Sequence, residues 1–118
     1  MSEILLVDDD ADIREALAIL LRDADHGVRE AANGRDALSL LEEGFRPSLI
    51  VLDLMMPVMN GWQFLEARGQ RRDLASIPVV VLTAAALDEK LHGLGVSGLR
   101  KPVNPDALLA AISKHLAS

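Results

Sequence analysis

The chain of 118 residues contains no cysteine and no tyrosine, and aromatic residues make up only 3% of it. Without cysteine there is no disulfide, zinc–thiolate site, iron–sulfur cluster or thiol nucleophile. The hydrophobic content is nevertheless 50%, so a core would have to be aliphatic. A chain of this length suits one domain and can bury a stable core without covalent staples. We therefore expect residues 1–118 to form a single domain.

Positive charge and long apolar runs are also scarce. Twelve Lys and Arg stand against eighteen Asp and Glu, which gives a net charge of −6. This balance argues against a nucleic-acid partner and against an anionic membrane surface. The longest apolar stretch, Ile77–Leu87, is well short of the roughly 20 residues of a membrane span. No basic segment precedes the first apolar run, so no signal peptide is indicated, and we expect a cytoplasmic protein.

Short apolar runs alternate with longer segments of helical periodicity along the chain. The runs that predict strands are Glu3–Val7, Val28–Ala31, Leu49–Leu52, Val79–Leu82 and a short piece around Leu99. The segments that predict helices are Ala11–Ala24, Gly34–Glu43, about ten residues from Trp62, Ala86–Gly93 and a last helix from Pro105. Such alternation is typical of an α/β fold with a parallel sheet covered on both faces. For five strands we expect a doubly wound sheet of order 2-1-3-4-5.

Polar residues follow directly on four of the expected strands. Asp8 and Asp9 follow the first strand, Asp53 the third, Thr83 the fourth and Lys101 the fifth. In a doubly wound sheet, ligands bind beyond the carboxyl ends of the strands, where the strand order reverses. We therefore expect these five side chains to share one small site. A general preference for polar residues at strand ends could explain any one of them, but explains four such ends poorly.

Three clustered carboxylates repel one another unless a cation lies between them, since two at 4 Å repel by about 4 kcal/mol at a dielectric near 20. Oxygen ligands without His or Cys suit Mg²⁺ better than a softer ion. The charges of three carboxylates, Mg²⁺ and Lys101 would cancel, so the site could receive a phosphoryl group. A carboxylate can attack phosphorus to give an aspartyl phosphate. Asp53, on the central strand, is the best candidate for that nucleophile.

Several motifs, in this order and spacing, resemble those of the receiver domain of two-component response regulators. They are Ile4–Asp10, Leu52–Pro57, Met59–Gly61, Val81–Ala84 and Lys101–Pro102. The resemblance covers essentially the whole chain. It implies a flavodoxin-like fold and a signalling switch that catalyses only its own phosphorylation and dephosphorylation.

By this resemblance, Asp53 would accept a phosphoryl group from a sensor histidine kinase or a phosphotransfer protein. Asp8 and Asp9, together with Asp53 and the backbone carbonyl of Met55, would hold Mg²⁺. The family also implies that the first helix helps to dock the kinase. The identities of the kinase and of the downstream target do not follow from the sequence.

The resemblance assigns two further residues to the phosphoryl group. Thr83 would hydrogen-bond one phosphoryl oxygen and Lys101 would pair with another. It also implies a cis peptide bond between Lys101 and Pro102.

One position departs from the family pattern. Receivers usually carry an aromatic residue on the fifth strand, three residues before the Lys, which rotates inward as the Thr moves. Here that position is Gly98. We therefore expect an atypical output that uses Ala84–Gly95 and the first helix. Separately, we expect a regulator that acts as a stand-alone domain.

Two other functions remain open. A receiver-like module that binds a partner without phosphorylation would be compatible with Gly98. A phosphohydrolase that forms an aspartyl phosphate would commonly need a second acid two residues after the nucleophile, where this chain has Met55.

Overall fold

The computed structural model describes residues 2–54, 58–83 and 97–116. Its centre is a parallel five-stranded sheet of order β2-β1-β3-β4-β5. The strands are β1 (Glu3–Val7), β2 (Gly27–Ala31), β3 (Leu49–Asp53), β4 (Val79–Thr83) and β5 (Ser97–Arg100). The predicted fold class and strand order are therefore confirmed.

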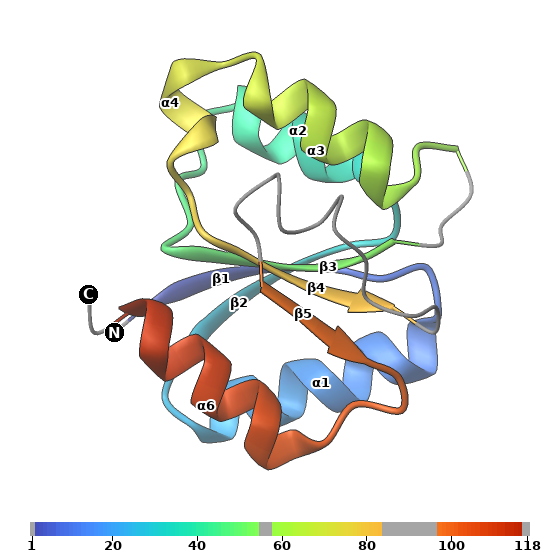
Figure 1. Ribbon diagram of the computed structural model, residues 1–118, viewed down its shortest axis with the longest axis vertical. Coiled ribbons are helices and arrows are strands. Elements are labelled where there is room, and N and C mark those ends of the chain that lie inside the picture. The colour runs from blue at the N-terminus through green and yellow to red at the C-terminus, as the bar shows by residue number, and fades with distance from the viewer. Residues whose placement is uncertain (1, 55–57, 84–96, 117–118) are drawn as a thin grey trace.

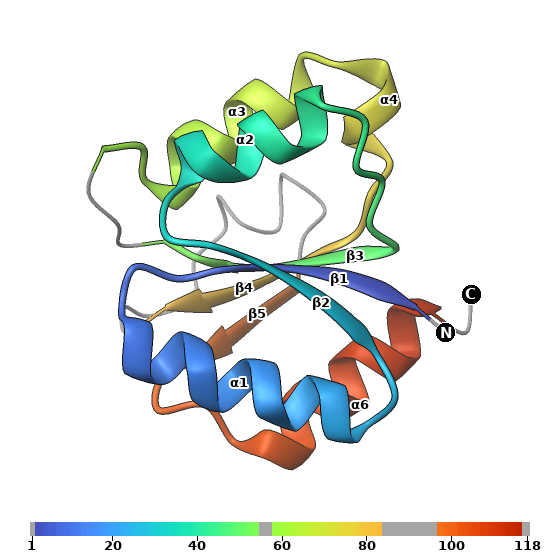
Figure 2. The same ribbon diagram turned by 180° about the vertical axis from the view of Figure 1, so that it is seen from behind.

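Helices cover both faces of this sheet (Figures 1 and 2). The helices are α1 (Ala11–Asp23), α2 (Gly34–Glu42), α3 (Gly61–Gly69), α4 (Arg72–Ala75) and α6 (Pro105–Leu116). The first and last helices lie on one face, and α2, α3 and α4 lie on the other. Each face of the sheet thus has its own hydrophobic core.

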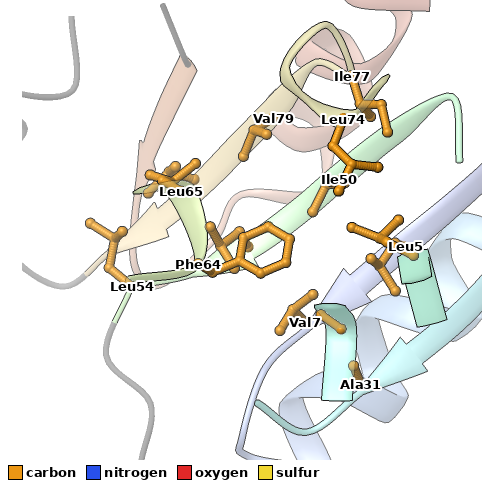
Figure 3. Packing of buried hydrophobic residues seen from close by; sticks show 14 residues of the cluster. Leu5, Val7, Ala31, Ile50, Leu54, Phe64, Leu65, Leu74, Ile77 and Val79 are labelled. Atoms are coloured by element: carbon orange, nitrogen blue, oxygen red, sulfur yellow. The ribbon is translucent and has the colours of Figure 1, made fainter. Parts of the chain in front are cut away.

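The central strands are buried because both of their faces are apolar. Every residue of β3 and of β4 is buried. Alternate side chains enter opposite cores: Leu5, Val7 and Ile50 pack under α2 and α3, as Figure 3 shows, whereas Ile4 and Val51 pack under α1 and α6. Strands with continuous apolar sequence are typical of such two-sided burial.

The helix ends follow local capping chemistry. The side chain of Asp10 accepts hydrogen bonds from the backbone N–H groups of Asp12 and Ile13, which identifies it as the N-cap of α1. Asn104 caps α6 in the same way, through the N–H of Ala107. The first helix ends at Asp23, one residue before the predicted end.

Two details differ from the expectations. The helical spacing of Ile13, Leu17 and Leu21 predicts that all three lie on the apolar stripe of α1, but Ile13 is 39% exposed and the buried stripe consists of Leu17, Ala18 and Leu21. The four-residue helix α4 was not predicted, because one turn is too short to show a periodic pattern. The expected helix Ala86–Gly93 lies outside the described residues. Within the described part of the chain, no helix has the length and apolarity needed to span a membrane.

Candidate functional site

Three acidic side chains converge at the carboxyl end of the sheet. Asp8 and Asp9 directly follow β1, and Asp53 is the last residue of the neighbouring strand β3. Each offers a carboxylate oxygen, and these three oxygens lie within 4.8 Å of one another. Asp8 and Asp53 are buried, whereas Asp9 is exposed. The topology therefore brings Asp53 beside two acids that lie 44 and 45 positions earlier in the chain, as their places at strand ends predicted.

Lys101 reaches this acidic cluster from the end of β5. Its Nζ atom lies 3.2 Å from Oδ2 of Asp53 and 3.6 Å from Oδ2 of Asp8. Its backbone N–H donates to the carbonyl of Thr83 at 2.8 Å, which continues the pairing of β5 with β4. The Lys101–Pro102 peptide bond is cis, as the family resemblance implied. The ammonium thus contacts the two buried carboxylates of the cluster.

The buried carboxylate of Asp8 is only partly satisfied by hydrogen bonds. Its Oδ1 accepts from the backbone N–H of Asp10 at 2.9 Å. Its Oδ2 is inaccessible to solvent and has no hydrogen-bond partner among the described residues. A buried oxygen without a partner is costly unless a ligand or cation satisfies it. The donor set, oxygen only and strongly negative, therefore fits Mg²⁺.

Close packing against α3 fixes the backbone around Asp53. The N–H of Gly61, at the start of α3, donates to the carbonyl of Leu54 at 2.9 Å. A Cβ atom on Gly61 would lie 2.8 Å from the carbonyl oxygen of Asp53 and 2.7 Å from Cα of Leu54. Such distances are too short for any residue but glycine. The close approach of the two backbones thus explains why glycine occupies position 61, which was noted above only as part of a motif.

Thr83 is the last residue of β4 and is 1% exposed. Its neighbour Leu82 is in register with Asp53, which puts Thr83 at the same edge of the sheet as the acidic cluster. Four of the five predicted strand-end positions thus belong to buried or partly buried residues, and Asp9 is the exposed one. Met55, whose carbonyl was expected to bind the metal, lies outside the described residues.

An apolar groove runs beside Lys101. It has a volume of about 470 Å³ and lies between α1 and the chain that follows β5. Ile13, Ala16 and Leu17 line it from the helix, and Pro102 and Val103 line it from the other side. The groove therefore adjoins the charged site along the helix that was expected to dock a kinase.

Arg14 contacts the backbone of the cluster, although no sequence motif points to it. Nη1 of Arg14, on the first turn of α1, donates to the backbone carbonyl of Asp8 at 2.7 Å. The only sequence signal was its place four residues after the N-cap Asp10, where an arginine is usually taken for a solvated surface residue.

Comparison with known proteins identifies the family. The model of the response regulator receiver domain matches residues 4–113. The chain therefore belongs to the receiver domain family of two-component response regulators, as the motifs predicted. Proteins of this class are signalling components and not conventional enzymes.

Individual relatives support the same assignment. The chain is 39% identical to the CpxR homolog, a transcriptional regulatory protein of Haemophilus influenzae, over 98% of its own length and 51% of that protein. It is 37% identical to the phosphate regulon regulator PhoB of Pseudomonas aeruginosa, over 96% of its length and 51% of that protein. The chain thus spans about half the length of these curated relatives.

Solved structures of similar length share the fold. The chemotaxis protein CheY4 of Vibrio cholerae superposes with a TM-score of 0.88 at 35% identity, covering 98% of this chain and 99% of that one. A putative response regulator of Chloroflexus aurantiacus gives 0.90 at 28% identity, with 99% and 98% covered.

Proposed function

We propose that this protein is a phosphorylation-dependent signalling switch that accepts a phosphoryl group on Asp53. The main support is the arrangement around that carboxylate: Asp53 is buried, two other acids lie within reach, and the Lys101 ammonium is 3.2 Å away. Membership of the receiver domain family supports the same conclusion. The phosphodonor would be the phosphohistidine of a sensor histidine kinase or of a phosphotransfer protein.

Phosphoryl transfer in this proposal needs little covalent chemistry from the protein. An oxygen of Asp53 forms a bond to phosphorus, while the bond between phosphorus and the donor imidazole nitrogen breaks. The electron pair of the broken bond stays on that nitrogen. Lys101 would then pair with one phosphoryl oxygen and Thr83 would hydrogen-bond another. The Lys101 ammonium offsets the negative charge of the phosphoryl group, and the Thr83 hydroxyl donates a hydrogen bond to it. The carboxylates alone would repel that negative charge.

The acids Asp8, Asp9 and Asp53, together with the backbone carbonyl of Met55, would hold Mg²⁺. When bound, the ion would offset the negative charge of the carboxylates and of the phosphoryl oxygens. The buried Oδ2 of Asp8 supports this assignment, because it otherwise has no hydrogen-bond partner among the described residues. Lys101 alone leaves an excess of negative charge on the three carboxylates.

The apolar groove beside Lys101 is our candidate for the region that receives the phosphodonor protein. One of its lining residues is Lys101, whose Nζ lies 3.2 Å from Oδ2 of Asp53, and α1 lines it on one side. Ile13 and Leu17 line it from this helix, and Ile13 is 39% exposed. A donor helix with an apolar stripe would bury these side chains while it presents its histidine to Asp53.

A direct test is incubation with acetyl phosphate and Mg²⁺, followed by intact mass measurement. We expect one phosphoryl group on the wild-type protein, cleavable by hydroxylamine, and none on Asp53→Asn. Asp10→Asn is the matched control, since it changes a neighbouring acid outside the cluster and asparagine also caps helices well. Continuous turnover of the donor would instead indicate a phosphohydrolase. A protein that takes up no phosphoryl group would be a phosphorylation-independent binding module.

We further propose that the output does not pass through a side chain on β5. Gly98 is paired with Val81 in the sheet and has no side chain that could rotate. Coupling between two sites requires some element with two arrangements. The alternative route is through residues 84–95 and α1. That residues 1–118 act as a stand-alone regulator also stays a prediction, which the mass of the native protein in cell extracts would test.

Hydrogen exchange with and without beryllium fluoride and Mg²⁺ tests this route. We expect the amides of Gly98–Arg100 to change little, while those of α1 and of residues 84–95 change clearly. A change concentrated in Gly98–Arg100 and α6 would contradict the proposal.

A further inference from the structure

The contacts of Arg14 link the acidic cluster to two other elements. Its Nη1 atom donates to the carbonyl of Asp8 at 2.7 Å, and its Nε atom lies 3.2 Å from Oε1 of Glu30 on β2. The Arg14 side chain is only 20% exposed and that of Glu30 is 33% exposed. The planar guanidinium presents donors in a fixed geometry, so two such contacts restrict its orientation.

The backbone of Asp8 is therefore held on both sides. Its N–H donates to the carbonyl of Ala31 on β2 at 3.1 Å, and its carbonyl accepts from Arg14. Its side chain accepts from the N–H of Asp10, which in turn caps α1. These contacts fix the turn Asp8–Asp10, from which two of the three clustered carboxylates project.

We propose that Arg14 is a positioning residue for Mg²⁺ binding, which rests on the proposed function of the acidic cluster. By holding the Asp8 carbonyl against α1 and β2, it keeps the carboxylates of Asp8 and Asp9 turned toward Asp53. Outer contacts that orient metal ligands commonly matter for affinity almost as much as the ligands.

Two possible roles of Arg14, through its charge or through positioning, predict opposite changes in Mg²⁺ affinity when the residue is replaced. The guanidinium is a cation close to a cation site, so by Coulomb's law alone its removal would strengthen Mg²⁺ binding. If Arg14 acts by positioning, its removal weakens binding, since the turn Asp8–Asp10 is no longer fixed. The direction of the change therefore separates the two roles.

Arg22 provides a matched control. It carries the same charge and its Nη2 lies 3.5 Å from Oε2 of the same Glu30, but its backbone contact is to Val28 and not to Asp8. Arg22→Gln thus removes one charge and one contact to Glu30 without touching the cluster.

The test is a titration with MgCl₂ followed by the backbone amide signals of Asp8–Asp10 in ¹H–¹⁵N spectra. We expect Arg14→Gln to raise the dissociation constant about tenfold, and Arg22→Gln to change it by less than about twofold. Unchanged or tighter binding in Arg14→Gln overturns the proposal. Should Arg14→Gln fail to fold by circular dichroism, Arg14→Lys replaces it. Weaker Mg²⁺ binding is expected there too, because an ammonium lacks the planar pair of donors.

A second readout separates positioning from chemistry. In Arg14→Gln the rate of phosphorylation by acetyl phosphate should be low at limiting Mg²⁺ and return to within about twofold of wild type at saturation. A rate that stays low at saturating Mg²⁺ contradicts a role through the metal ligands. A wild-type protein that binds no Mg²⁺ would refute the proposed metal site itself, and with it the role of Arg14.

Discussion

Buried charged side chains at the two ends of the sheet differ in their hydrogen-bond partners. At the amino end, Arg68 is only 8% exposed, yet its guanidinium donates to the carbonyls of Ala75 and Ile77 at 2.8 Å. At the carboxyl end, Oδ2 of Asp8 is fully buried and has no hydrogen-bond partner among the described residues. The buried cation has hydrogen-bond acceptors within the chain, whereas the buried Oδ2 of Asp8 has only the Lys101 ammonium at 3.6 Å and no hydrogen-bond donor among the described residues.

This difference separates groups that stabilise the fold from groups that await a ligand. Burial lowers the pKa of Arg68, because desolvation disfavours its charged form, but its hydrogen bonds offset that cost. At the carboxyl end, the carboxylate of Asp8 accepts the N–H of Asp10 on Oδ1, while its buried Oδ2 has no hydrogen-bond partner among the described residues. We infer that the amino end contributes stability, while the carboxyl end gives up stability for the proposed phosphoryl chemistry.

The largest effect on stability is expected at the amino end. Arg68→Met keeps most of the apolar packing but removes the guanidinium donors from the buried carbonyl of Ile77 and from the partly buried carbonyl of Ala75. We expect the free energy of unfolding to fall by about 2–3 kcal/mol, measured by urea denaturation.

Arg71→Met is the control for that substitution. Arg71 is also an arginine near the end of α3, but its side chain is 42% exposed and pairs with Asp73 at 3.3 Å. Exposed ion pairs contribute little, so a loss below about 0.5 kcal/mol is expected. Equal losses in both variants would show that burial of Arg68 does not matter for stability.

Much of this division between the two ends was predictable from the sequence, because strands buried on both faces read as apolar runs and end where polar residues begin. That rule located β3, β4 and the cluster of Asp8, Asp9 and Asp53. The burial of Arg68 could not be predicted in this way, since its partners Ala75 and Ile77 offer backbone carbonyls that leave no trace in residue type.

The contacts of Arg14 escaped prediction for a similar reason. Its partners are a backbone carbonyl and a carboxylate on another strand, Glu30, so no local pattern reveals them. The role of Gly61 could be predicted in part. The sequence shows the motif that contains it, but only the structure shows the close approach of α3 to the Asp53 backbone.

At the carboxyl end, Mg²⁺ should stabilise the fold. A ligand that binds only the folded state adds about 1.4 kcal/mol at ten times its dissociation constant, so the melting temperature should rise with millimolar MgCl₂. Asp9→Ala should abolish most of that rise, because Asp9 is one of the three acids but is exposed, and its loss should not disturb the core. A wild-type melting temperature indifferent to Mg²⁺ would contradict the proposed metal site.

The smallest predicted effect compares backbone strain at the two ends. Val58, in the loop after β3, and Asp25, between α1 and β2, both have a φ of 69°. This left-handed conformation is tolerated by aspartate but is a true outlier for a β-branched residue. Val58 is also 71% exposed, so its side chain gains little from packing.

Replacing each residue by glycine should therefore give different results. Val58→Gly relieves the steric cost and should raise the free energy of unfolding by about 0.5–1 kcal/mol, after the greater freedom of glycine in the unfolded chain is subtracted. Asp25→Gly has less strain to relieve and should leave stability unchanged or slightly lower. Urea denaturation of both variants decides the matter. A destabilised Val58→Gly would show that the exposed valine makes a stabilising contact, and that the carboxyl end stores no strain at this position.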